Sequence, residues 1–485
     1  MSRAKKSLIL FVASIVPHLY GITSPVLDYH YHRQANTAVI ARNYHEDGLP
    51  FLHPRIDWHG NDHGVAATEF PLYMWLVGLF WGALGLGQIW GRILSVLFSG
   101  LTTVVLFHFL SEWLEEDASF WGALMFCFLP VEVYFGRTVQ PESLALLCYA
   151  AALWAFGRYL RSDPFPNLWG AFATVSAGIT IALKIPYAHV WLILAFLAWT
   201  QKGPAAFRDW KVWFFLLLYT VPAALWYLYT SITVIEEAVL PTSIGGILNL
   251  LDYLYNPRVM AYYSFYHLFS RFPELTTTYA GLVFFGFGAW TFYARKIWFP
   301  FLWWLAVLGY TIAGGGYTFV HEYTALPFAL VNAAFLGIGF VQLQKQAPKI
   351  VMAILILAIP VHMSLRIKHW YNLNYTFLLR IKPITDKLSA PNDLFFCNNR
   401  ASSLYLFFIE RRGWSWDLKE YGENRLSAFD AITRQGAKFF LTEKDATFSS
   451  KTDPIARHFF KNFRIAYEDP DVLIFRLHPI PRLRR

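Results

Sequence analysis

Long apolar runs separated by short polar segments fill most of the 485-residue chain. A membrane-spanning helix needs about 20 mostly apolar residues. Runs of this kind cover residues 7–24, 89–111, 119–137, 141–160, 167–183, 185–200, 211–231, 277–294, 297–313, 323–343 and 349–366. The pattern predicts a polytopic α-helical membrane protein with about 11 spans. A shorter apolar segment, 71–87, is ambiguous between a crossing and a helix at the membrane surface.

Positive charge between the runs decides how segment 71–87 is interpreted. Cytoplasmic loops of membrane proteins are enriched in Lys and Arg. The basic segments between the runs are 158–161, 201–211, 295–296 and 345–349. These four segments lie on the same side of the membrane as the basic N-terminus only if 71–87 does not cross it, and that side is then the cytoplasm. We therefore expect an uncleaved first span, and an interfacial or re-entrant helix over 71–87.

The same parity places the large polar segments outside the cytoplasm. They are the loops 25–70 and 232–276 and the tail from about residue 370. We therefore predict a transmembrane domain over 1–369, whose active site faces outward, and a separate extracytoplasmic domain over 370–485.

The tail differs from the rest because apolar and polar residues alternate in it. Strands are predicted over 393–397, 438–441 and 472–477. An amphipathic helix is predicted over 425–434, and Gly436 can supply its left-handed cap. The tail is therefore predicted to be a small soluble α/β domain.

Composition supports the membrane assignment and excludes some functions. The chain is 56% hydrophobic and 15% charged, whereas soluble domains carry about 25% charged residues. The net charge of +9 is spread over short loops and forms no basic stripe, so nucleic acid is not an expected partner. Three cysteines give no disulfide framework, and no Walker or dinucleotide motif occurs.

Three carboxylates recur on the predicted outer face: Asp28, Glu69 and Glu142. Transfer of a group from a phosphate ester to a hydroxyl needs a base near the acceptor. It also needs positive charge or a metal at the departing phosphate. Cations available on this face are Arg137, Lys184 and Arg258. Each residue also has a structural interpretation, since Glu142 could cap a helix and Lys184 could extend towards lipid head groups.

Histidines concentrate in the first outer loop, at His30, His32, His45, His53, His59 and His63. With Asp or Glu they could bind a divalent cation, but no tight ligand spacing such as His-Glu-x-x-His occurs. Solvated or substrate-lining roles are therefore favoured for each of them. His267 and His321 are further candidates, and the metal question stays open, with Asp28, Glu69 and His267 as candidate ligands.

The order of these features resembles the GT-C membrane glycosyltransferases. The resemblance rests on Asp28 with Arg33, on Glu69-x-Pro71-Leu72 with Trp75, on Gly85 and Arg92, and on His321-Glu322-Tyr323 through Pro327. Bacterial relatives of the protein O-mannosyltransferases and of the lipid A aminoarabinose transferase are the most similar groups. The chain departs from them in three ways: Tyr29-His30 follows Asp28, Glu replaces the usual Asp at 142, and no Gly follows Lys184.

The resemblance implies a transferase that takes a sugar from a polyprenyl-phosphate donor outside the cytoplasm, in a bacterial inner membrane. The acceptor would be a lipid, a glycan or a protein. Asp28 would be the base or an acceptor-orienting carboxylate, and Glu69 and Glu142 would assist it or hold a metal. Lys184 would meet the lipid phosphate. The remaining candidates, Arg33, His53, His267, His321 and Tyr323, would bind substrate.

Two other functions are compatible with a polytopic membrane protein. A transporter or flippase of a lipid-linked molecule would favour ionisable residues in mid-span and an internal repeat, whereas the polar residues here gather on one face. A non-catalytic assembly subunit would keep its activity after Asp28→Ala.

Overall fold

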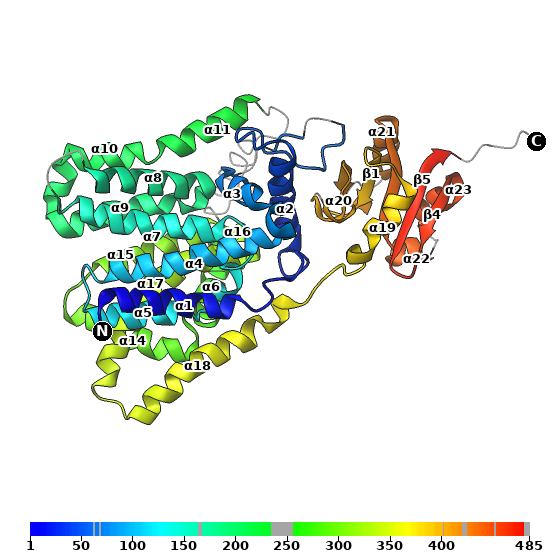
Figure 1. Cartoon of the computed structure of the whole chain (residues 1–485). Coiled ribbons are helices and arrows are strands. Elements are labelled where there is room, and N and C mark those ends of the chain that lie inside the picture. The colour runs from blue at the N-terminus through cyan, green and yellow to red at the C-terminus, as the bar shows by residue number, and fades with distance from the viewer. Residues whose placement is uncertain are drawn as a thin grey trace, which may run out of the picture. The chain divides into compact units, whose positions relative to one another are not determined.

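The computed structural model describes residues 1–61, 64–66, 69–162, 167–233, 256–400, 402–419, 424–450 and 453–479 (Figure 1). The chain divides into two compact units. The first comprises Met1–Thr23, Ala67–Tyr73 and Ile89–Tyr371. The second comprises Ser24–Ala66, Met74–Gln88 and Asn372–Arg485.

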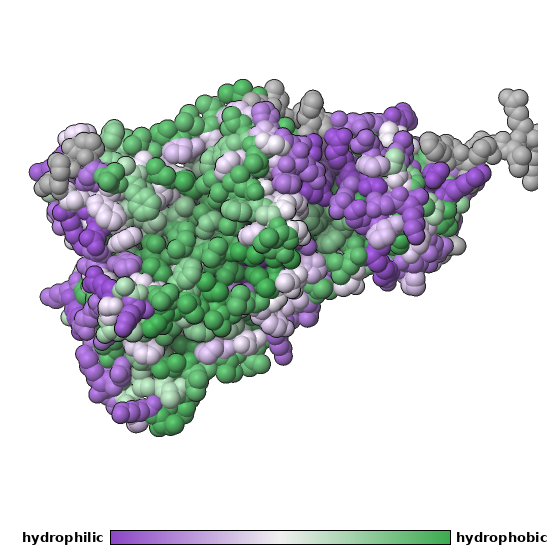
Figure 2. Space-filling view, in the orientation of Figure 1, coloured by the Kyte–Doolittle hydropathy of each residue, from purple (hydrophilic) through white to green (hydrophobic). Residues whose placement is uncertain are grey.

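Helices make up the first unit, and Figure 2 shows hydrophobic side chains gathered over them. Their bounds are α1 (Arg3–His18), α4 (Ile89–Leu110), α5 (Glu116–Phe126), α6 (Pro130–Phe135), α7 (Glu142–Tyr159), α8 (Leu168–Leu183), η2 (Ile185–His189), α9 (Val190–Lys202), η3 (Gly203–Arg208), α10 (Trp210–Leu218), α11 (Val221–Thr233), α13 (Pro257–Tyr266), η4 (His267–Thr277), α14 (Tyr279–Ala294), α15 (Phe299–Ala313), α16 (Gly315–Val320), η5 (Glu322–Ala325), α17 (Leu326–Gln344), α18 (Lys349–Ile367) and η6 (Lys368–Tyr371).

Four helices in the described part of the chain are long and apolar enough to cross a membrane. They are Ile89–Leu110, Trp210–Thr230, Glu322–Gln344 and Lys349–Tyr371. Three shorter apolar helices follow the predicted runs as well: Leu168–Leu183, Tyr279–Ala294 and Phe299–Ala313. The membrane character of the fold is thus supported, while the predicted total of about 11 spans stays a prediction.

Prolines interrupt two of the predicted runs. Run 119–137 is not one helix, because α5 ends at Phe126 and α6 begins at Pro130. A proline lacks the N–H that a helix interior needs but fits the first helical position. Run 185–200 begins with a 3₁₀ turn that contains Pro186 before α9 starts. Arg137 lies in the segment between α6 and α7, and Lys184 lies at the extended C-cap of α8, just before the second break.

Helix α17 forms the core of the first unit, with 94% of its spanning segment buried. Glycines allow its neighbours to approach closely. A side chain at Gly122 on α5 would collide with the Ala333 carbonyl, and one at Gly337 would collide with the Ala118 carbonyl. Small residues at such crossings let helix backbones pack directly on one another. The pairing also shows that α5 and α17 run antiparallel.

One end of the first unit gathers the basic segments. Arg158 and Arg161 both bind Glu112 at 2.8 Å, and Arg295 binds Glu115 at 3.3 Å. The N-terminal Arg3 binds Glu116 at 3.0 Å. Because α17 runs antiparallel to α5, Lys345 emerges at this end as well. We call it the basic end.

The second unit holds a helix where the sequence predicted a loop. Helix α2 (Tyr31–Glu46) lies inside segment 25–70, so describing that whole segment as a loop was wrong. Ten of its 16 residues are buried, and they surround the helix instead of forming one stripe. The amphipathic period that reveals a surface helix is therefore absent. Asp57 fixes this helix, because its carboxylate accepts bonds from Arg42 and Asn43.

Segment 71–87 forms a short helix, α3 (Leu72–Phe80), and a 3₁₀ turn, η1 (Ala83–Gly85). Nine helical residues rise about 14 Å, roughly half of the hydrocarbon thickness. The helix α3 is therefore too short to cross a bilayer. The second predicted outer loop, 232–276, lies partly outside the described residues, at 234–255. Its described part is helical, in α13 and the π-helix η4, rather than a loop.

A five-stranded sheet organises the tail, with the order β2-β1-β3-β5-β4. The elements are α19 (Leu378–Leu388), β1 (Leu394–Asn398), α20 (Leu404–Ile409), β2 (Gly413–Trp416), α21 (Arg425–Arg434), β3 (Ala437–Glu443), α22 (Ala446–Ser450), α23 (Pro454–Asn462), β4 (Phe463–Glu468) and β5 (Val472–Pro479). Strand β1 pairs in parallel with β2 and β3, whereas β5 is antiparallel to β3 and β4. The three predicted strands and helix 425–434 are confirmed, and β2 and β4 were missed.

Candidate functional site

Lys184 is the centre of a buried ionic cluster in the first unit. Its ammonium lies 2.6 Å from Oε1 of Glu142 and 3.7 Å from Oε1 of Glu69. The Glu142 side chain is fully buried, Lys184 is nearly so, and Glu69 keeps 20% of its side chain exposed. Two carboxylates around one ammonium leave a net negative charge. We call these three residues the Lys184 cluster.

Chain breaks bring the members of the Lys184 cluster together. Lys184 is the C-cap of α8 and has an extended backbone, so the helix ends at this residue. Glu142 is the first residue of α7, after Pro141. The backbone N–H of Phe70 donates to the Ala182 carbonyl at 3.1 Å, so Glu69 is held beside the end of α8. Glu142 thus acts as an ion-pair partner, although a negative charge in the first turn also suits the helix dipole.

Aromatic side chains cover the Lys184 cluster. The ammonium lies 5.3 Å from the centre of the Tyr323 ring, within cation–π range. His321 stacks on Tyr323 with ring centres 5.0 Å apart, and the Tyr317 hydroxyl lies 3.3 Å from that of Tyr323. The late segment predicted from the resemblance therefore reaches the same place as Glu69, Glu142 and Lys184.

Tyr187 is a further group near this cluster that the sequence did not single out. Its hydroxyl is buried and has no hydrogen-bond partner among the described residues. A phenol hydroxyl is both a donor and an acceptor, so this group can donate a hydrogen bond. The proline of the turn Ile185–His189 was a usable signal, because it places Tyr187 next to Lys184 instead of inside a helix.

Arg271 is a second missed residue. It is 2% exposed, lies on η4, and donates to the carbonyls of Thr318, Phe319 and His321. It also lies 3.4 Å from the Glu322 carboxylate. Arg271 therefore fixes the backbone that carries His321 and Tyr323. From the same region, the sequence analysis named Arg258 instead, as a cation on the predicted outer face.

His267 lies on the same π-helix, and its Nε2 is 3.2 Å from the Thr318 hydroxyl. Burial, with a smaller contribution from the positive Arg271, lowers the pKa of His267 to about 4. The imidazole is therefore neutral at pH 7. It supports the segment 318–323 through Thr318.

The other two predicted cations lie elsewhere in the first unit. Arg137 is fully buried, donates to the Gly21 carbonyl at 3.1 Å and stacks 4.3 Å from the Tyr371 ring centre. It borders the site through Phe135, whose ring packs edge-on against Tyr323. Arg258 is exposed on α13 and makes no ion pair with any residue that the structure describes.

Asp28, Arg33 and His53 belong to the second unit. Asp28 is fully buried, and its Oδ1 accepts a hydrogen bond of 2.7 Å from Gln34 of α2. Arg33 lies in the first turn of α2 and is half-buried, whereas His53 is exposed. His63 lies outside the described residues.

The described ranges contain no preformed metal site, because no group of three or more His, Cys, Asp or Glu side chains comes together in them. The candidates Glu69 and His267 lie in the first unit and Asp28 in the second. No cofactor is established.

Comparison with known proteins supports the sequence resemblance. Residues 62–229 match the family described as dolichyl-phosphate-mannose-protein mannosyltransferase. That segment contains Glu69, Arg137, Glu142 and Lys184. No curated protein matches the chain by sequence.

Solved structures show the fold. ArnT from Cupriavidus metallidurans bound to undecaprenyl phosphate aligns with a TM-score of 0.65 at 11% identity, over 96% of this chain and 97% of that one. This chain has a GT-C fold. The oligosaccharyltransferase AglB from Archaeoglobus fulgidus, in complex with an inhibitory peptide and a dolichol-phosphate, shares the GT-C fold with a TM-score of 0.57 at 11% identity, over 95% and 72% of the two chains. The same archaeal enzyme complexed with Zn and sulfate aligns with a TM-score of 0.56 at 11% identity, over 97% and 73%.

Proposed function

We propose that the chain transfers a sugar from a polyprenyl-phosphate-linked donor to an acceptor on the extracytoplasmic side of the membrane. The observation that carries this proposal is the Lys184 cluster, a buried cation between two carboxylates under Tyr323, in a GT-C fold. Ionisable residues inside a membrane protein are costly and are functional candidates by default. The ArnT structure with undecaprenyl phosphate supports a lipid phosphate as the ligand of this fold.

In the proposed reaction, Lys184 stabilises the negative charge that develops on the departing lipid phosphate. Glu142, in direct contact with it, keeps the ammonium in place. Glu69 is farther from the ammonium and more exposed, so it is the carboxylate that an incoming phosphate would displace. Tyr187 can donate a hydrogen bond to the same phosphate, and Arg137 and Arg258 are further candidates for donor binding.

Asp28 remains our proposed base or acceptor-orienting carboxylate. Its carboxylate is buried and accepts a hydrogen bond from Gln34, which fixes its orientation. Arg33, His53, His267, His321 and Tyr323 are proposed to contribute to substrate binding. The transferase domain is proposed to span residues 1–369, with the domain 370–485 outside the cytoplasm.

The test uses membranes that contain the full chain, a labelled polyprenyl-phosphate sugar and candidate lipid, glycan or protein acceptors. Asp28→Asn keeps the shape of the side chain and the acceptor for Gln34, so expression and folding should be normal while label transfer is lost. Asp47→Asn is the matched control, because Asp47 is a partly exposed carboxylate of the same unit that pairs with Arg55 at 3.2 Å. Undiminished transfer by Asp28→Asn would reject its assigned role. Absence of transfer by the unmodified chain with every donor would argue against the transferase.

A further inference from the structure

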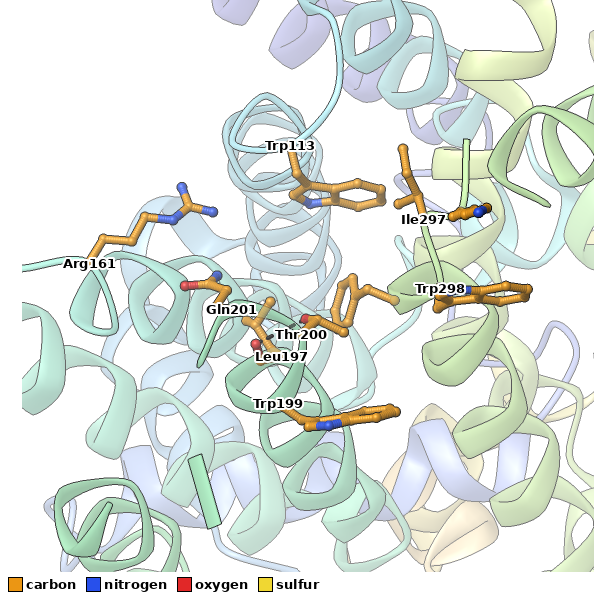
Figure 3. A pocket seen from close by; sticks show the side chains of 10 residues that line it. Trp113, Arg161, Leu197, Trp199, Thr200, Gln201, Ile297 and Trp298 are labelled. Carbon is orange, nitrogen blue, oxygen red and sulfur yellow. Dashed lines mark hydrogen bonds between the residues drawn. The ribbon is translucent and has the colours of Figure 1, made fainter. Parts of the chain in front are cut away.

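A cavity of about 490 Å³ opens at the basic end of the first unit (Figure 3). Its walls come from the turn after α4, the C-terminal part of α9 and the turn into α15. Figure 3 shows Trp113, Trp199 and Trp298 around the open space, with Arg161 and Gln201 on one side. The volume lies within the range of about 300–1,000 Å³ that ligand pockets occupy.

The cavity is separate from the Lys184 cluster. Helix α7 begins with Glu142 and ends at Tyr159, two residues before Arg161. Helix α9 follows the turn after Lys184 and ends beside Gln201 at Lys202. The cluster and the cavity therefore lie at opposite ends of the same helices, and a ligand in the cavity is not the proposed sugar donor in its reacting position.

Charge at the rim favours an anion. Arg158 and Arg161 share the single carboxylate of Glu112, so one positive charge is left over. Lys296 also lines the cavity, is exposed, and makes no ion pair within the described part of the chain. Two excess positive charges therefore border the opening.

The remaining walls favour a ligand with an apolar part. Trp199 is 41% and Trp298 is 50% exposed, and Leu197 and Ile297 add aliphatic surface. Tryptophans of this kind lie at the level of lipid head groups in membrane proteins. Basic pockets between membrane helices are known to bind anionic lipid head groups. A free inorganic anion would leave the indole surface uncovered.

We propose that this cavity binds an anionic glycerophospholipid of the leaflet at the basic end. Its phosphate pairs with Arg161 and Lys296, and the first carbons of its acyl chain pack on Trp199 and Trp298. The bound lipid joins four segments that are far apart in sequence: 113, 161, 197–201 and 296–299.

The test is native mass spectrometry of the full chain in detergent, titrated with phosphatidylglycerol. Arg161→Gln and Lys296→Gln should each weaken binding about five-fold, and together about 25-fold, because one cation near the lipid surface is lost at each step. The charge-matched control is Lys345→Gln with Lys349→Gln, which removes two exposed cations of the basic end outside the cavity and should change binding less than two-fold. Trp199→Ala should weaken phosphatidylglycerol binding with no loss of charge.

Three results would overturn the proposal. Equal loss of binding in the control pair would show that the lipid responds to the overall charge of this end. Equal affinity for phosphatidylcholine would show that the cations do not select an anion. Binding of inorganic phosphate as tight as that of phosphatidylglycerol would identify a site for a free anion instead. The comparison requires that the thermal unfolding midpoint of each variant equals that of the parent chain.

Discussion

Replacing Lys184 with Met separates the structural from the chemical role of the Lys184 cluster. The change removes an ammonium that lies 2.6 Å from a fully buried carboxylate, Glu142. Removing one partner of a buried ion pair costs about 3–5 kcal/mol, because the charge of the other partner stays buried and unpaired. Glu69 adds little to this cost, since its carboxylate is partly exposed and 3.7 Å away. We expect a lower thermal unfolding midpoint in detergent and reduced expression.

A double variant, Lys184→Met with Glu142→Met, removes both charges together. Replacing a buried pair by apolar side chains of similar volume is often neutral or stabilising, so the free energy of unfolding should return to within about 1 kcal/mol of the parent. Sugar transfer should behave differently. Loss of a group that stabilises developing negative charge lowers the rate about 10²–10³-fold, and the double variant cannot restore it.

The assay measures the unfolding midpoint and label transfer for the parent, both variants and Lys184→Arg. The arginine variant keeps the positive charge, so it should retain more transfer and a higher unfolding midpoint than the methionine variant. Recovery of transfer by the double variant would refute the reasoning. Lys184 would then serve to neutralise Glu142, and the site of phosphate binding would have to be sought elsewhere.

Two further predictions concern pH and sidedness. The pKa of His267 is lowered from 6.5 to about 4, so the unfolded chain binds more protons between these values. The stability that depends on a neutral His267 is complete above about pH 6.5 and falls by about 3 kcal/mol as the pH drops to about 4. His267→Gln should flatten this part of the profile of unfolding midpoint against pH, and exposed His53→Gln should not. For sidedness, a cysteine at Lys345 should react with an impermeant thiol reagent only from the cytoplasm, and a reporter after Arg485 should be active only outside. Labelling of the same cysteine from outside would invert the assigned topology.

The sequence predicted the apolar helices and the tail better than the segments between them. Apolar runs such as 89–111 and 323–343 coincide with α4 and α17 because length and hydropathy alone decide a spanning helix. Strand β3 was recognisable as a short buried run, with four consecutive buried residues, whereas β4 was hidden because it is mostly exposed or half-buried. Helix α2 was missed because burial on all sides removes the amphipathic period.

The site shows a different limit. Glu69, Glu142 and Lys184 were each recognised by residue type at a span boundary. The contact of Glu142 with Lys184 follows from how α7 and α8 pack, and that of Glu69 from the bond between Phe70 and Ala182, and no local pattern encodes either. Arg271 was missed because its role is to bond carbonyls of another segment. Such a role carries no signature of spacing or neighbours in sequence.

The energetics of the charges support our proposal that the Lys184 cluster serves chemistry rather than stability. Pairs at the basic end are partly exposed, as with Arg158 and Glu112 at 42% and 15% of their side chains, and such pairs contribute about 0–1 kcal/mol each. The Lys184–Glu142 pair lies in a buried setting, where the cost of desolvation often exceeds the attraction, so apolar residues would serve the fold at least as well. A polar cluster that the fold does not require, placed where chain breaks free the ends of two helices, is the arrangement expected of a site that handles a charged substrate.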